Sequence, residues 1–228
     1  MMKESSPTRA RVGRPAEEED AETSDETSNR IIDVAAQLFT AQGFAATVIE
    51  QVASACGAGK DTICRRFPSK AALFAAVVER MRTRTLNGLQ AEIDAAGGSG
   101  GDALSRLKRI ARWFLDVNLE PDMIALNRIA LSEAPLLGED QRDQWESDPI
   151  TDRLVALVAA AQWDGRLGGD DPRMIAAHLL HSIVFGPSND AMLGRMTYTS
   201  SEARDRFFDQ AWALFLHGAG RSLPATAR

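Results

Sequence analysis

The chain of 228 residues is 44% hydrophobic and 25% charged, a globular composition that excludes a disordered, collagen-like or disulfide-rich protein and, at this length, predicts one large domain or two smaller ones. Its longest apolar runs, 71–78 and 154–161, are far shorter than the ~20 residues that a membrane-spanning helix needs, and no signal peptide is evident, so we expect a cytoplasmic protein with no membrane partner. The net charge of −6 hides a basic segment, residues 30–84, which has eight Lys/Arg against four Asp/Glu and suggests a small cationic module that contacts a polyanion.

The first segment, residues 1–27, has few large apolar side chains and many Ser, Thr, Asp and Glu residues, so we expect a disordered tail. A basic patch that includes Arg9 and Arg14 precedes the acidic run 17–20. The patch could touch DNA phosphates or the minor groove. The segment could equally be a solvated tail, and the acidic run favours this second interpretation. A further short tail is expected at residues 221–228.

The chain between these tails is expected to be all-α, because apolar residues recur at helical spacing and no stretch shows the sustained two-residue alternation of a strand. The apolar stripe that starts at Ile31 should end at Gly43, a residue suited to a left-handed helix end. Thr47 can cap a short second helix, which stops at Gly57.

A third helix, from about Lys60 to Phe67, must end before Pro68, and Ser69 then caps a long fourth helix. Among the later helices, 172–185 and 203–217 are long and apolar, and the first contains small residues that permit close approach. We therefore predict a homodimer formed through these two helices.

The second and third predicted helices have the spacing of a helix-turn-helix. In that motif a small residue lies where the helices cross, and the turn needs a residue that tolerates positive φ. Ala53 and Gly57 fit these two roles, and Ile63 can pack the second helix back against the first. The pattern favours DNA binding, although any small helical pair could show it by chance.

A longer stretch, residues 31–74, resembles the N-terminal domain of the TetR family of bacterial transcriptional regulators without a gap. The resemblance implies a three-helix DNA-binding domain over 28–75 and a helical ligand-binding and dimerisation domain over 76–220. It also implies repression that a small molecule releases. The matching residues are Ile31 to Phe39, Gly43, Phe44, Thr47, Val52, Ala53, Ala55, Gly57, Lys60, Thr62, Ile63, Arg65, Phe67 to Lys70, Leu73 and Phe74.

By this resemblance, residues 60–67 form the recognition helix, which lies in the major groove of a double-stranded DNA operator. Arg65 and Arg66 have planar guanidinium groups, which can donate two hydrogen bonds to guanine O6 and N7. Asp61 replaces a frequent glycine and would repel phosphate unless it meets a cytosine amino group or pairs with Arg65. The side chains suited to phosphate contacts are Thr47, Lys60, Thr62, Ser69 and Lys70.

Other departures from the family pattern change the expected operator rather than the framework. Cys64 stands where the family commonly has a tyrosine, Gly59 replaces a capping serine, and Arg66 replaces a common histidine or tyrosine. Cys64 and Cys56 could form a thiol switch, but we favour two small apolar residues of the module.

No cofactor, metal or catalytic residue is expected. His178 and His181, three residues apart, could face one metal ion, but without an acidic or cysteine partner at a recognisable spacing they fit core or interface packing better. The sequence also has no HExxH, P-loop or GxGxxG motif, which argues against an enzyme.

The C-terminal region faintly resembles the efflux and multidrug-regulator group over residues 128–137. We therefore hypothesise a homodimeric repressor released by a small hydrophobic effector. The alternatives are an activator, a co-repressor-dependent regulator, or a helical small-molecule-binding protein without a regulatory role. The large side chains most able to line an apolar cavity, which a core needs equally, are Trp113, Phe114, Met123, Ile124 and Trp145.

Overall fold

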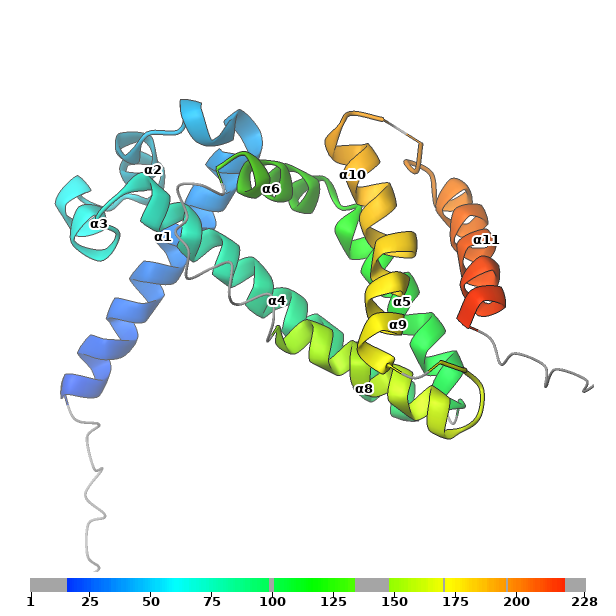
Figure 1. Cartoon of the computed structure of the whole chain (residues 1–228). Helices are drawn as coiled ribbons and strands as arrows, with labels where there is room; N and C mark the ends of the chain where they lie inside the picture. The colour runs from blue at the N-terminus through cyan, green and yellow to red at the C-terminus, as the bar shows by residue number, and fades with distance from the viewer. Residues whose placement is uncertain (1–15, 99–100, 134–147, 170, 196, 220–228) are drawn as a thin grey trace, which may run out of the picture.

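The computed structural model describes residues 16–98, 101–133, 148–169, 171–195 and 197–219 (Figure 1). All regular structure in these ranges is helical, which confirms the predicted fold class. None of the described helices is long and apolar enough to cross a membrane. The helices are α1 (Ala16–Ala46), α2 (Ile49–Cys56), α3 (Lys60–Arg66), α4 (Lys70–Gly98), α5 (Ala103–Asn118), α6 (Pro121–Ser132), α8 (Pro149–Trp163), α9 (Pro172–Leu179), the π-helical turn η2 (Leu180–Phe185), α10 (Gly186–Met192) and α11 (Ser201–Ala219).

The first helix begins well before the predicted boundary near Thr27. α1 starts at Ala16, so a helix occupies 16–27, where we expected a disordered tail. This segment lacks large apolar residues, but alanine and glutamate are strong helix formers, and acidic residues near a helix N-terminus interact favourably with its dipole. The helix is interrupted at Gly43, where φ is 83° as predicted but ψ is 170°, outside the left-handed helical region.

A small core joins α1, α2, α3 and the start of α4 at one end of the molecule (Figure 1). The rings of Phe39 and Phe74 meet edge to face with centroids 5.1 Å apart, and both side chains are fully buried. Leu126 and Ile129 of α6 also belong to this core. The core of the N-terminal domain therefore includes residues of a helix that lies far along the chain.

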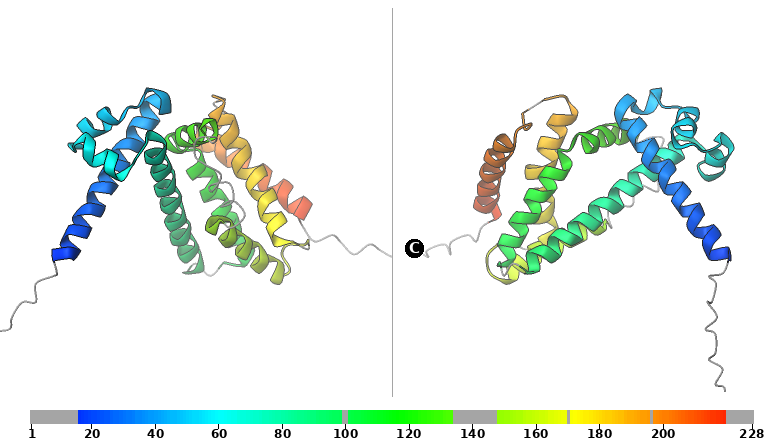
Figure 2. Two further views of the ribbon diagram at one scale, coloured as in Figure 1. Left: turned by 60° about the vertical axis from the view of Figure 1, so that its left-hand side comes forward. Right: turned by 180° about the vertical axis from the view of Figure 1, so that it is seen from behind.

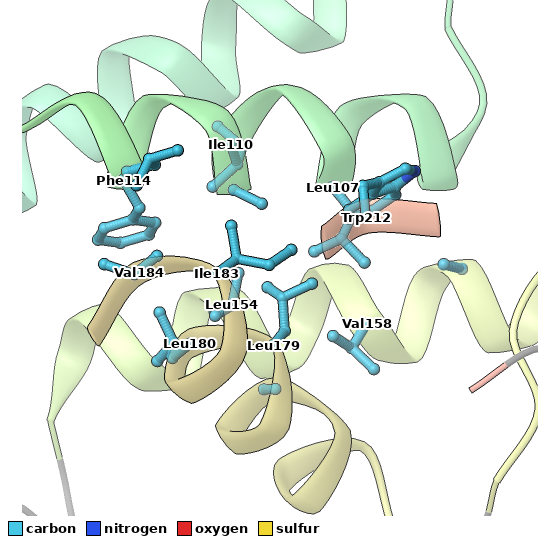
Figure 3. Close-up of a cluster of buried hydrophobic side chains, with 14 of the residues drawn as sticks. Leu107, Ile110, Phe114, Leu154, Val158, Leu179, Leu180, Ile183, Val184 and Trp212 are labelled. Atoms are coloured by element: carbon cyan, nitrogen blue, oxygen red, sulfur yellow. The ribbon is translucent and has the colours of Figure 1, made fainter. Parts of the chain in front are cut away.

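A second, larger core lies between α5, α8, α9, η2 and α11. In Figure 3, Leu107, Ile110 and Phe114 extend from α5 towards Leu179 and Ile183. Leu107, Ile110, Leu179 and Ile183 are fully buried, and Phe114 is nearly so. The long α4 runs from one core to the other, as both views in Figure 2 show, so it links the two domains mechanically.

The predicted helix 172–185 is a composite of α9 and η2. At its end the N–H of Gly186 bonds to the carbonyl oxygen of His181, five residues back, which is the spacing of a π-helix. Pro187 follows and has no N–H for the next bond, so the usual hydrogen-bond ladder cannot continue there.

Candidate nucleic-acid interface

The turn between α2 and α3 has the geometry that the sequence predicted. Gly57 adopts the left-handed conformation (φ 65°, ψ 27°), and the N–H groups of Gly57 and Ala58 both bond to the carbonyl oxygen of Ala53. Ala53 is 8% exposed and Ile63 is fully buried. The two helices therefore pack closely over small and apolar side chains, with α3 on the outside of the molecule (Figure 1).

Arg30 of α1 reinforces this turn, a role that the sequence analysis missed. Its Nη2 donates a hydrogen bond to the carbonyl oxygen of Cys56, at the C-terminus of α2. A Cβ atom added at Gly57 would lie 3.1 Å from the same Nη2 atom. Glycine is thus required here by its positive φ and by the closeness of the arginine.

Three of the eight predicted DNA contacts lie on the outer face of α3. Lys60, Asp61 and Arg65 are exposed together, as is Cys64, whereas Cys56 is buried. The interpretation of both cysteines as small apolar residues of the module therefore fits Cys56, whereas Cys64 is exposed on α3.

Arg66 points elsewhere, although the sequence paired it with Arg65 as a reader of bases. Its Nη1 donates to the hydroxyl oxygen of Ser28 on α1 at 2.6 Å, and its side chain is only partly exposed. Thr62, four residues earlier, lies on the same flank of the helix and is also half-buried. The exposed face of α3 therefore offers Arg65 to base edges, while Arg66 is held against α1.

Two of the predicted phosphate contacts have internal roles. Thr47 is 1% exposed, and its hydroxyl donates to the carbonyl oxygen of Gly43 at 2.8 Å. It does not cap α2, because Val48 occupies the cap position. Lys70 Nζ donates to the carbonyl oxygens of Phe44 and Thr47, at 2.8 and 3.0 Å. Both side chains stabilise the end of α1, where unpaired carbonyls attract a cation.

Ser69 and Lys60 remain at the surface. The Ser69 hydroxyl oxygen accepts the N–H of Ala72 at 3.0 Å, which confirms its predicted role as the cap of α4. Lys60 Nζ lies 2.6 Å from a carboxylate oxygen of Glu50 on α2. This hydrogen bond raises the pKa of Lys60 and lowers that of Glu50, so both groups keep their charges. Glu50 therefore competes with any phosphate for this lysine.

Ion pairs fix α4 against α1 beside this interface. The guanidinium of Arg80 binds both carboxylate oxygens of Asp33, at 2.9 and 3.0 Å, and Arg84 binds the first of them at 3.0 Å. Two parallel N–H···O bonds give such a pair a defined orientation. The start of α4 is thereby held to the DNA-binding domain.

The proposed effector-pocket residues separate into two groups. Trp113 and Phe114 are in ring contact, with centroids 5.1 Å apart, and Phe114 is 3% exposed. Met123 and Ile124 are half-buried on α6. Trp145 lies outside the described residues.

Trp113 packs closely against α4. A Cβ at Gly88 would lie 2.8 Å from the indole Cζ2 atom of this tryptophan. One of the proposed pocket residues therefore contacts the helix that links the two domains.

The predicted histidine pair lies at the surface. His178 and His181 are exposed, which excludes packing in the core of a single chain, and His181 Nδ1 lies 2.8 Å from the carbonyl oxygen of Ala177. Within the described ranges, no group of three or more His, Cys, Asp or Glu side chains is arranged to hold a metal ion.

An exposed, cationic helix presented by a tight turn on a small three-helix core defines a helix-turn-helix DNA-binding protein. Residues 31–77 match the family model of bacterial regulatory proteins, tetR family, and residues 105–218 match that of the AefR-like transcriptional repressor, C-terminal domain. The chain belongs to the tetR family of transcriptional regulators.

A curated relative agrees with this assignment, and solved structures have a similar fold. The transcriptional regulator RutR of Escherichia coli O157:H7 is 30% identical over 170 residues, which cover 72% of this chain and 77% of RutR. A TetR-family regulator from Mesorhizobium loti superposes with a TM-score of 0.73 at 23% identity, covering 87% of this chain and 98% of its own. The flavonoid-responsive regulator FrrA superposes with a TM-score of 0.59 at 27% identity, covering 87% of this chain and all of its own.

Proposed function

We propose that this DNA-binding regulator is a homodimeric repressor that acts in the cytoplasm and leaves a palindromic operator when a small hydrophobic effector binds. The observation that carries the proposal is the exposed face of α3, on which Lys60, Asp61 and Arg65 are free of the core. A guanidinium there can bind guanine O6 and N7, and a carboxylate can accept from a cytosine amino group. Lys60, Thr62 and Ser69 are the proposed phosphate contacts.

The proposed dimer would use α9, η2 and α11. These helices lie at the end of the molecule opposite α3 in Figures 1 and 2. Met174 on α9 and Leu214 on α11 are large apolar side chains that are 58% and 72% exposed, so they are available to a second copy. A second copy that covered them by two-fold symmetry would supply a second recognition helix for the other half of the operator.

The effector would act through α4 and α6, because both helices contribute residues to the small core of the DNA-binding domain. The structural relative FrrA is described as flavonoid-responsive, and a regulator from Saccharomonospora viridis with a TM-score of 0.65 was solved with choline. Trp113 packs on α4, and Leu126 of α6 belongs to the small core. A ligand that moved either helix could therefore shift the separation of the two recognition helices, provided that it bound this shifted state more tightly.

The test is the selection of genomic fragments by the purified protein at near-physiological salt, followed by sequencing. Recovery of a short inverted repeat, and release of that fragment by a hydrophobic compound, would support the proposal. Recovery of an inverted repeat whose occupancy increases with the compound would indicate a co-repressor instead. Retention without any motif, lost on addition of salt, would contradict sequence-specific binding.

A further inference from the structure

A pocket of about 250 Å³ lies beside the recognition helix, between α1 and the turn that joins α2 to α3. Its lining includes Thr27 and Arg30 from α1 and Thr62 from α3, together with the backbone at Gly57. Arg30 is exposed, and both threonines are half-buried. The pocket therefore opens next to the exposed face of α3 and is separate from the proposed effector residues.

The polar side chains of this lining are suited to an anion. Arg30 is the charged side chain among the described residues of this lining, and although its Nη2 bonds to the carbonyl oxygen of Cys56, a guanidinium has five N–H donors. Thr27 and Thr62 add two hydroxyl groups. Hydroxyls beside a guanidinium are the side-chain groups that bind phosphate oxygens in protein–DNA complexes.

The position of the pocket relative to α3 indicates which kind of phosphate could reach it. Asp61 and Arg65 point outward and Ile63 points inward, so Thr62 lies on the flank between them. Arg66 shares this flank and is bonded to Ser28 of α1. A helix in the major groove has a sugar–phosphate strand along each flank. The flank that faces α1 therefore brings the pocket towards one strand.

We propose that this pocket binds a backbone phosphate at the edge of the half-site, with Arg30 and Thr27 of α1 as DNA contacts outside the helix-turn-helix. The inference rests on the proposed function, because it requires α3 to enter the major groove. Asp25 and Glu26, exposed on the preceding turn of α1, oppose an anion at this site. Arg30 must outweigh them, so Glu26→Gln is expected to strengthen DNA binding.

The experiment measures binding of the full chain to its selected operator fragment as a function of salt concentration. Arg30→Gln should reduce the slope of log K against log salt by about one, equally for operator and non-specific DNA. Thr27→Val should weaken binding without unfolding α2, since it leaves the Arg30 bond to Cys56 in place. Thr40→Val is the matched control, because the hydroxyl of Thr40 bonds within α1 to the carbonyl oxygen of Gln37 at 3.0 Å.

Neutral methylphosphonate substitutions then locate the contact. Substitution of one particular phosphate should weaken DNA binding by the wild-type protein and by Arg65→Ala. The same substitution should not change DNA binding by Arg30→Gln. If both Arg30→Gln and Thr27→Val bound DNA with the affinity and the salt slope of the wild-type protein, the inference would be overturned. The proposed function would remain intact. Saturable binding of inorganic phosphate with an unchanged salt slope would assign the pocket to a free anion and also overturn it. A wild-type protein that selects no DNA sequence would overturn the proposed function first.

Discussion

Replacing Gly57 by alanine should destabilise the helix-turn-helix by about 2–4 kcal/mol. At φ 65° an L-residue costs about 1–2 kcal/mol. The new Cβ would also lie 3.1 Å from Arg30 Nη2. Displacing the guanidinium would remove its hydrogen bond to the carbonyl oxygen of Cys56, which we value at about 1–2 kcal/mol for a partly exposed charged donor.

Gly59→Ala is the matched control for this prediction. Gly59 has φ −67°, and its added Cβ would meet only the Thr62 hydroxyl oxygen at an ordinary 3.7 Å. We expect a loss of about 0.5 kcal/mol, because alanine is a poorer helix cap than glycine. Two neighbouring glycines of one turn should thus respond differently.

Urea unfolding followed by two probes measures the difference. Circular dichroism reports all helices, whereas all four tryptophans lie outside residues 28–75, so their fluorescence reports the larger domain. Gly57→Ala should lower the circular-dichroism midpoint more than the fluorescence midpoint. Equal free energies of unfolding for the Gly57 and Gly59 variants would refute the roles assigned to positive φ and to Arg30.

Three further substitutions test other contacts. Lys70→Met should lower the free energy of unfolding by about 1–2 kcal/mol, measured by urea denaturation, because it removes the cation from the carbonyls at the end of α1; unchanged stability with weaker DNA binding would instead favour a phosphate contact. Glu50→Gln should free Lys60 for phosphate and steepen the salt dependence of DNA binding; a shallower slope would contradict this. Gly88→Ala should displace the indole of Trp113, which a shift in tryptophan emission would detect, and an unchanged spectrum would show that the ring does not press on α4.

Local signals in the sequence predicted the DNA-binding module well. Gly57 and Pro68 set the ends of α2 and α3 because their backbone restrictions act within one or two residues. Ala53 and Ile63 could be assigned to the packed faces because helical periodicity relates them directly to the crossing. These features depend on short stretches of chain, which a single sequence contains in full.

The sequence did not reveal the hydrogen bonds that polar side chains make to backbone carbonyl oxygens of the fold. Lys70 and Thr47 have the chemistry of phosphate contacts, but both bond to carbonyl oxygens near the end of α1. Arg30 reaches α2 in the same way. Residue type cannot distinguish a carbonyl from a phosphate oxygen as the acceptor, so only the fold separates the two roles. The association of Leu126 with the small core likewise depends on tertiary packing.

The most direct measurement is the affinity of Arg65→Ala and of the wild-type protein for the selected operator and for single-base variants of it. If α3 reads DNA through this exposed guanidinium, the substitution should remove about 1–3 kcal/mol of discrimination at one base pair in each half-site. The discrimination at other positions and the thermal stability of the protein should not change, because Arg65 lies outside both cores. The same affinities and the same base preferences in both proteins would contradict the assignment of α3 as the recognition helix.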